Sequence, residues 1–215
     1  MCIRDSERSY ADASLSFCDE LALEYKLKVL ETSDLSALDE PAKVIKNAGE
    51  SFGKLDGLVL NHAYSVNSTI FDCTAENIDN HFNINVRASM LMIQAFAQQI
   101  DLNQGGVITL FTSGQYLGPM INEIAYAVSK EAIRSLCMQA SVALAKHNIR
   151  VNCINPGPTD TSYLNGVAYD QVAQMFPSGK WGTPEDAAKL VHFLHSDYAQ
   201  WITGQTIASE GGFQR

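Results

Sequence analysis

The sequence predicts one α/β domain in which a parallel sheet is covered by helices on both faces. Segments with the apolar periodicity of helices alternate along the 215 residues with short apolar runs of strand length. These runs do not alternate between polar and apolar residues, which is typical of strands buried on both faces. The composition, 46% hydrophobic and 18% charged residues, is that of an ordinary globular protein. Together these observations predict a doubly wound, three-layer α/β fold with a single core.

The expected elements follow one another in the order of βαβ units. Helical spacing of apolar residues predicts helices over 11–26, 41–52, 74–99, 124–147 and 184–195, and each begins or ends at polar residues or glycine. Strands are expected between them over 28–31, 57–61, 106–112, 149–154 and 205–208. The sequence contains no internal repeat and no linker, so residues 1–215 are assigned to one domain.

Charge and apolar patterning argue against several classes of function. The chain has 15 Lys and Arg against 24 Asp and Glu, so a net charge of -9 disfavours binding to nucleic acid or to an anionic membrane surface. The longest apolar runs, 57–60 and 107–111, are far shorter than the roughly 18 residues of a membrane span. The first residues also lack the apolar stretch of a secretory signal.

Cysteine and histidine usage indicates a reducing compartment and no metal centre. The five cysteines are odd in number, widely spaced and flanked by apolar residues, which favours buried free thiols over a disulfide framework. We therefore expect a cytoplasmic location. His192 and His195 lie three residues apart on a helix with no third ligand nearby, so no metal site is predicted.

The residues that follow the expected strands are candidates for a ligand site, because ligands of parallel sheets bind beyond the carboxyl ends of the strands. The informative exits are Asp34 after strand 28–31, Asn61-His62-Ala63-Tyr64 after 57–61, Ser113-Gly114 after 106–112 and Asn155-Pro156-Gly157-Pro158-Thr159 after 149–154.

Tyr126 and Lys130 are the strongest candidates for catalysis. A spacing of four residues places the phenol and the ammonium on one face of helix 124–147, and the ammonium would lower the pKa of the phenol. A carbonyl that is being reduced by hydride needs a proton donor and a second hydrogen-bond donor at its oxygen, and Tyr126 and Ser113 fit these two roles. Chance alone gives a Tyr-x-x-x-Lys spacing in about one such chain in three, but the serine at a strand exit and the Pro-Gly at the next exit make coincidence improbable.

With these residues in place, the sequence resembles the short-chain dehydrogenase/reductase family over residues 34–212. The resemblance implies a Rossmann-like fold and hydride transfer between NAD or NADP and a carbonyl or secondary alcohol. It also implies a catalytic tetrad of Asn85, Ser113, Tyr126 and Lys130, in which Asn85 holds a proton-relay water. The cofactor-binding residues that it implies are Asp34 at the adenine ring, Asn61, His62 and Ala63 after strand 57–61, Tyr126 and Lys130, and Pro156, Gly157, Thr159 and Thr161 around the nicotinamide. The sequence Asn61-His62-Ala63-Tyr64 departs from the usual Asn-Asn-Ala-Gly and keeps only Asn61 and Ala63.

One departure from the family concerns the cofactor. The Thr-Gly-x-x-x-Gly-x-Gly turn, which binds the cofactor pyrophosphate, is absent from these residues together with the two strands around it. Gly49, Gly53 and Gly57 do not replace it, because they precede a strand instead of following one. We therefore expect an N-terminally incomplete sheet in which strand 28–31 moves beside 57–61, and very weak binding of nicotinamide dinucleotides by these residues alone.

Two functions stay open at this point. The first is an NAD(P)-dependent oxidoreductase, and the second is a non-catalytic family member that acts as a binding or oligomer partner. The retained tetrad favours the first.

The sequence also indicates candidates for the substrate and for the assembly. The C-terminal motifs 181–186 and 202–212 resemble those of 3-oxoacyl-carrier-protein reductases, which makes a 3-oxoacyl thioester one candidate among small carbonyl or alcohol substrates. Segment 162–180 fits either an apolar lid over the site or a helix pair packed on the core. A homotetramer or homodimer is expected, because apolar residues are predicted on the outward faces of the two long helices: Met90, Ile93, Ala97, Leu136 and Ala140.

Overall fold

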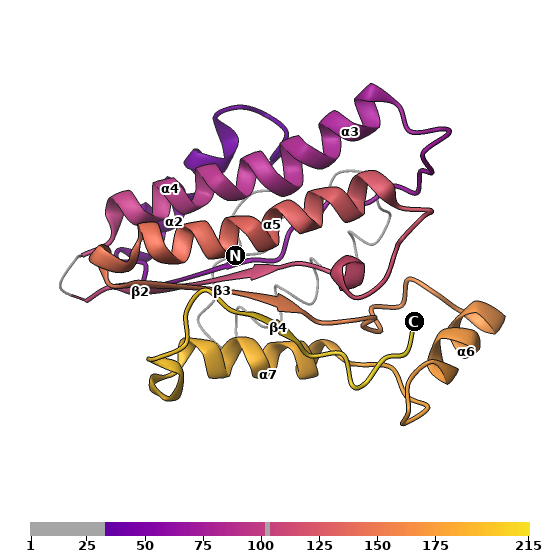
Figure 1. Cartoon of the computed structure of the whole chain (residues 1–215). Helices are drawn as coiled ribbons and strands as arrows, with labels where there is room; N and C mark the ends of the chain where they lie inside the picture. Colours follow the sequence, from indigo (N-terminus) through magenta and orange to yellow (C-terminus); the bar gives the residue numbers. More distant parts are fainter. Residues whose placement is uncertain (1–32, 102–103) are drawn as a thin grey trace.

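The computed structural model describes residues 33–101 and 104–215 and contains one four-stranded parallel sheet with the order β1-β2-β3-β4. The strands are β1 (Gly57–Leu60), β2 (Gly106–Phe111), β3 (Ile149–Asn155) and β4 (Thr206–Ala208). Helices α2, α3, α4 and α5 lie on one side of the sheet and α7 lies on the other, so the predicted three-layer α/β fold is confirmed (Figure 1). The predicted helix 11–26, the predicted strand 28–31 and its predicted place beside 57–61 lie outside the described residues.

The register of the strands brings their carboxyl ends to one edge. Leu60 pairs with Leu110 of β2, and Phe111 pairs with Ile154 of β3. The residues that leave β1, β2 and β3 therefore lie side by side at this edge, where a ligand site was expected. Burial on both faces holds for the centre of the sheet but not for β1, in which Val59 is 42% exposed. In the described part of the chain β1 is the edge strand of the sheet, paired only with β2.

Helix α2 (Glu40–Phe52) shows how the apolar pattern builds the core. Its buried residues, Pro41, Val44, Ile45 and Ala48, follow the spacing of one helical face. This face packs against α4, and Phe96 and Met92 of α4 are fully buried with Ile108 and Leu110 of β2. Gly53 ends the helix with a positive φ of 80°, which glycine adopts without strain.

The predicted helix 74–99 has an interruption that apolar periodicity did not indicate. It consists of α3 (Ala75–His81), a π-helical turn (Phe82–Arg87) and α4 (Ala88–Gln99). The predicted helix 124–147 is α5 (Ile124–Ala143) followed by a short 3-10 turn, Ala145–His147.

The outward-facing positions predicted on these helices are partly wrong. Ile93 and Ala140 belong to the buried core, and Ala97 and Leu136 are partly buried against it, whereas Met90 is 52% exposed. The error arises because α4 packs against α2 while its residues also join the core cluster, and because α5 contacts both β2 and β3, so the buried arc of each helix is wider than one face.

The C-terminal third contains α6 (Gly166–Gln174), α7 (Pro184–His195) and β4. Helix α6 has no buried residue, so segment 162–180 forms a single short helix and not a helix pair packed on the core. Thr183 begins α7 with a reciprocal capping arrangement with Asp186. None of the helices in 33–101 and 104–215 is long and apolar enough to cross a membrane.

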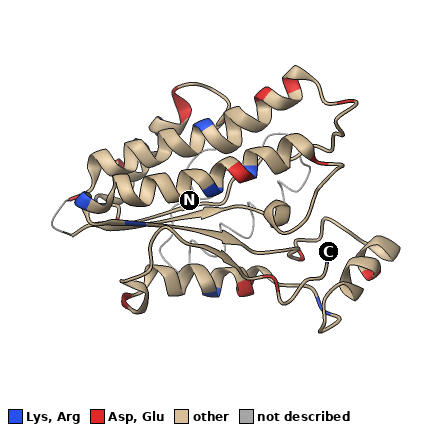
Figure 2. Ribbon diagram, in the orientation of Figure 1, with Lys and Arg blue, Asp and Glu red and all other residues tan. Residues whose placement is uncertain are grey.

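The charged residues are spread over several elements (Figure 2), and the cysteines of the described residues are free thiols. Figure 2 shows Lys and Arg scattered over separate elements, with Asp and Glu mainly on the helices and loops. Cys137 and Cys153 are buried free thiols, as predicted, and burial raises the pKa of each to about 12. Cys73 is also free but only partly buried. Cys2 and Cys18 lie outside the described residues.

Candidate active site

Lys130 is the buried cation at the carboxyl edge of the sheet. It lies on α5 and is 3% exposed, and its Nζ donates a hydrogen bond of 3.0 Å to the carbonyl of Phe111 at the end of β2. The same Nζ lies 5.7 Å from the centre of the Tyr126 ring. Burial lowers the pKa of Lys130 from 10.5 to about 8, because the charged form loses hydration. The charge is therefore held beside the phenol, as the spacing of the two residues predicted.

Ser113 is fixed next to this pair by contacts between its loop and α5. Thr112 Oγ1 donates to the carbonyl of Lys130 at 2.8 Å. The amide of Gln115 donates to Thr112 Oγ1 at 3.0 Å and to Glu131 at 2.9 Å. Ser113 lies between Thr112 and Gln115 and is partly exposed, as is Tyr126, so both residues are open to a ligand at this edge.

Asn85 joins three elements of the site. Its Oδ1 accepts from the backbone N–H of Tyr64 at 2.6 Å, and its Nδ2 donates to Tyr64 O at 3.0 Å and to Ser129 Oγ at 2.8 Å. Ser129 in turn donates to the carbonyl of Tyr126 at 2.8 Å. The structure thus brings the side chain of Asn85 to the loop after β1 and to the turn of α5 between Tyr126 and Lys130.

His81 and Ser129 belong to this region and were not among the predicted residues. His81 is fully buried, with its ring edge-on to Tyr64 and to Tyr126 at centroid distances of 4.8 and 6.4 Å. Its Nδ1 lies 2.7 Å from the carbonyl of Asn77, and its Nε2 accepts from the N–H of Val66 at 3.3 Å. The i,i+4 spacing of His81 and Asn85 was a sequence signal that could have indicated a shared face.

Three of the predicted cofactor-binding residues, Asn61, His62 and Ala63, directly follow β1. Asn61 is exposed, Ala63 is partly exposed, and His62 turns its ring toward the helix that contains Asn85. Burial, with the Lys130 charge, lowers the pKa of His62 from 6.5 to about 4. Asp34 lies in an exposed turn in which its carboxylate accepts from the N–H of Ser36 at 2.9 Å. Hydrogen bonds from the Ser36 hydroxyl and from this N–H lower the pKa of Asp34.

The loop after β3 has the features of a cradle for a planar ligand group. Asn155 Oδ1 accepts from the N–H of Gly157 at 3.1 Å, whereas its buried Nδ2 has no hydrogen-bond partner in 33–101 and 104–215. Gly157 has φ 65°, and a Cβ there would lie 2.9 Å from Cβ of Glu210. Thr159 donates to the carbonyl of Gly157 at 3.3 Å, and Thr161 is exposed. The unpartnered Nδ2 donor of Asn155 fits a ligand with hydrogen-bond acceptors, such as a nicotinamide carboxamide.

The C-terminal residues close one side of this edge. Arg215 forms an ion pair with Glu210, its guanidinium packs against Gly114, and its methylene carbons pack against Gly118. The segment that contains Glu210 therefore contacts both the loop after β3 and the loop that contains Ser113.

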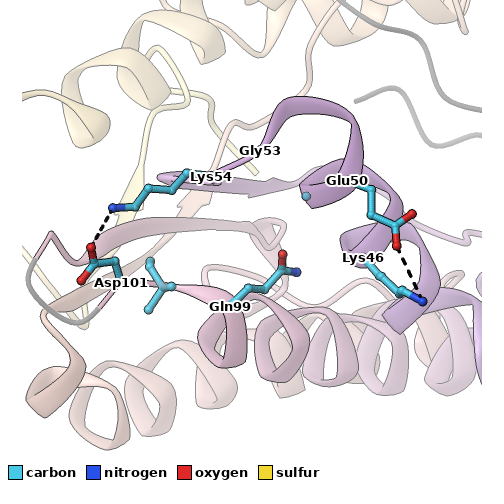
Figure 3. Close-up of a pocket in the computed structure, with 8 residues that line it drawn as sticks. Lys46, Glu50, Gly53, Lys54, Gln99 and Asp101 are labelled. Carbon is cyan, nitrogen blue, oxygen red and sulfur yellow. Dashed lines mark hydrogen bonds and ion pairs between the residues drawn. The ribbon is translucent and has the colours of Figure 1, made fainter.

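A second hollow lies at the opposite end of the sheet. It has a volume of about 510 Å³ and lies where α2 and α4 end, before β1 and β2 begin (Figure 3). Ion pairs of Lys46 with Glu50 at 3.7 Å and Lys54 with Asp101 at 3.3 Å flank it. Gly49 and Gly53 lie here, within and after α2, and so are not at the edge where the strands end.

The parallel sheet with Tyr126, Lys130 and Ser113 at its carboxyl edge defines a dehydrogenase-like α/β protein, and comparisons with known proteins agree. Residues 9–214 match the family described as enoyl-(acyl carrier protein) reductase. An uncharacterized oxidoreductase of Bacillus subtilis is 38% identical over 185 residues, which are 85% of this chain and 73% of that protein. The 2-dehydro-3-deoxy-D-gluconate 5-dehydrogenase of Dickeya dadantii is 31% identical over 188 residues, 85% of this chain and 74% of that enzyme.

Solved structures agree as well. A putative short-chain alcohol dehydrogenase from Sinorhizobium meliloti superposes with a TM-score of 0.84 at 25% identity, covering 92% of this chain and 81% of that one. A short-chain dehydrogenase/reductase variant from Serratia marcescens gives a TM-score of 0.86 at 24% identity, covering 99% and 86%. The chain belongs to the short-chain dehydrogenase/reductase family, and it is an oxidoreductase of that family.

Proposed function

We propose that the protein interconverts a carbonyl compound and its secondary alcohol with NAD or NADP, using Tyr126, Ser113, Lys130 and Asn85. The observation that supports this most is the buried Lys130 ammonium beside Tyr126, linked through the Phe111 carbonyl to the strand end that precedes Ser113. A buried positive charge favours the phenolate form of Tyr126 and so makes proton exchange at its oxygen easier near neutral pH.

Each side chain has a distinct role in this reaction. Tyr126 gives a proton to the carbonyl oxygen during reduction, or takes it from the alcohol during oxidation. Ser113 donates a hydrogen bond to the same oxygen, where negative charge develops. Bound nicotinamide would supply or accept the hydride. Asn85 already uses both amide hydrogens on Tyr64 O and Ser129 Oγ, so a relay water would be held through the remaining lone pair of its Oδ1.

The cofactor is proposed to lie along the carboxyl edge of the sheet. Its nicotinamide end would be held by Pro156, Gly157, Thr159 and Thr161, where the free Nδ2 of Asn155 adds a donor. Its ribose and adenine would be held by the side chains of Asp34, Asn61, Tyr126 and Lys130 and by the backbone of His62 and Ala63, since the His62 ring turns toward Ile84.

The substrate is proposed to enter between α6 and the loop after β2. Trp181 is buried there among aromatic rings, stacked on Tyr169 at 5.0 Å and near Phe176 at 6.1 Å. These contacts hold the segment as an ordered wall, which supports the lid alternative for 162–180. One similar protein is named for a sugar-acid derivative and another is an L-rhamnose 1-dehydrogenase (NAD(P)(+)). Sugar-derived alcohols therefore join 3-oxoacyl thioesters as the first substrates to test.

A homodimer or homotetramer is proposed as the working form. Met90 on α4 and Val128, Met138 and Val142 on α5 are exposed apolar residues on neighbouring helices. Burial of such a face in a second copy would remove apolar area from water. Light scattering at micromolar concentration that gives a monomer would contradict this part. The buried thiols fit the cytoplasmic location that we propose.

The experiment is turnover by the purified protein with NAD and NADP against a panel of ketone and alcohol pairs. Wild type should convert at least one pair, and Ser113→Ala should lower its kcat by about 100-fold or more. If the wild-type protein binds cofactor but converts no pair, the non-catalytic alternative is favoured.

A further inference from the structure

The helix that contains Asn85 changes its hydrogen-bond pattern at that residue. Over Phe82–Arg87 it is π-helical, and the N–H of Ala88 donates to the carbonyl of Asn83, five residues back. In an α-helix the same N–H would donate to the carbonyl of Ile84. The π-helical turn therefore takes the Ala88 N–H away from Ile84 O, and a partly buried carbonyl is stabilised by a substitute donor.

His62 supplies that substitute from the loop after β1. Its Nε2 lies 3.1 Å from Ile84 O, and because a carbonyl only accepts, Nε2 must be the protonated nitrogen. Ser89 Oγ lies 3.3 Å from the same Nε2 and donates to the next carbonyl, Asn85 O, at 2.6 Å. The two side chains thus bind two successive carbonyls of the π-helical turn.

The other nitrogen of His62 agrees with this tautomer. Nδ1 is buried and has no hydrogen-bond partner among the described residues. A protonated Nδ1 would be a buried unsatisfied donor, so the neutral ring with its proton on Nε2 is the stable form here. The ring is therefore a fixed donor toward the helix.

The direction of the Asn85 side chain depends on this turn. If the turn became α-helical, residues on either side of the change would rotate relative to one another by about 100°. In the present register the amide of Asn85 contacts both the backbone of Tyr64 and the hydroxyl of Ser129. His62 is two residues before Tyr64, so the loop is tied to the helix at two neighbouring points.

We infer that His62, together with Ser89, is a positioning residue that fixes Asn85 in the catalytic arrangement by supplying hydrogen bonds to the carbonyls of the π-helical turn. This inference rests on the proposed function, in which Asn85 belongs to the tetrad. It assigns a role to a residue that differs from the asparagine usual at this place in the family. His62→Asn is therefore the conservative variant, since an amide can also donate.

The test combines His62→Leu, His62→Asn and Asn85→Ala in the full protein. His62→Leu should lower kcat about tenfold or more, because it displaces Asn85. The cofactor Kd should stay within about twofold, because the imidazole ring directs its donor at the helix and not at the cofactor. His62→Asn should restore most of the lost kcat. In the Asn85→Ala background, His62→Leu should cause no additional loss, since its effect acts through Asn85.

The matched control is His195→Leu. His195 is another partly buried imidazole, with its Nε2 3.0 Å from Thr109 Oγ1, but it contacts the other face of the sheet, and its replacement should leave kcat within about twofold. A wild-type kcat in His62→Leu, or losses that multiply in the double variant, would overturn the inference.

A measurement that requires no substrate conversion can test this inference independently of the proposed function. Nuclear magnetic resonance should find the Nε2–H tautomer of His62 in wild type, and amide exchange at Ala88 and Ser89 should be faster in His62→Leu than in wild type. Unchanged exchange would overturn the inference even if the protein reduces no carbonyl. A protein that shows the expected exchange but no turnover would instead contradict the proposed function.

Discussion

Replacing Lys130 by methionine should stabilise the cofactor-free protein while removing its activity. The ammonium is 3% exposed, and burial lowers its pKa from 10.5 to about 8. Each pKa unit corresponds to about 1.4 kcal/mol, so the folded protein loses about 3 kcal/mol at neutral pH by keeping this lysine charged. Methionine has a similar shape and no charge, and it leaves only the carbonyl of Phe111 without its 3.0 Å donor, which costs about 1 kcal/mol. The net gain in the free energy of unfolding is about 2 kcal/mol.

The sign of the pH dependence makes the prediction specific. Because the folded pKa is lowered, the unfolded chain holds the proton more tightly, and the destabilisation by Lys130 is complete below about pH 8 and disappears as the pH rises toward 10.5. Urea unfolding of wild type and Lys130→Met should therefore show a gain at neutral pH that shrinks by about 2 kcal/mol at about pH 9.5. The matched control is Lys146→Met, at an exposed site just after α5, which should change stability by less than about 0.5 kcal/mol at either pH. A Lys130→Met protein that is less stable than wild type at neutral pH, or a gain that does not vary with pH, would refute the reasoning.

Three further predictions concern other parts of the site. The free energy of unfolding of wild type should fall as the pH drops from about 6.5 to about 4, because His62 has a lowered pKa in the folded protein and takes up its proton more readily in the unfolded chain. His62→Asn should show a smaller fall over this range. Acid titrations of unfolding that coincide for the two proteins would contradict this. Gly157→Ala should weaken cofactor binding about tenfold or more, because residue 157 has a positive φ and an added Cβ would collide with Glu210. A wild-type affinity measured by calorimetry would argue against a cofactor site in this loop. Ser129→Ala should lower kcat and leave the cofactor Kd unchanged, because it removes the hydroxyl that Asn85 contacts; equal steady-state constants would exclude that link.

The sequence was sufficient for the layers of the fold and for the placement of Lys130 beside Tyr126. Mainly apolar runs without alternation correctly predicted β2 and β3, because a strand buried on both faces favours apolar residues on both of them, although β3 also buries Asn152. The Tyr126 and Lys130 pair followed from a spacing of four on one helix, which is a local property.

Features that depend on contacts between distant segments could not be predicted in this way. A π-helical turn adds only one residue to a turn, so the apolar periodicity around Asn85 is nearly unchanged. The burial of Ile93 and Ala140 depends on the second neighbour of each helix, and that neighbour is set by tertiary packing. The link from His62 to Ile84 joins residues 22 positions apart and has no sequence signature.

The central claim is that a nicotinamide cofactor bound at this edge of the sheet would supply hydride to a carbonyl that receives its proton from Tyr126. The most direct measurement uses a reduced cofactor labelled with deuterium at the nicotinamide carbon that gives up hydride, and detects the label in the alcohol product by mass spectrometry. Wild type should place deuterium on the former carbonyl carbon, whereas Tyr126→Phe should bind the cofactor with nearly the same Kd and form almost no labelled product. Labelled product formed by Tyr126→Phe at the wild-type rate, or its absence from wild type with cofactor and substrate bound, would contradict the account.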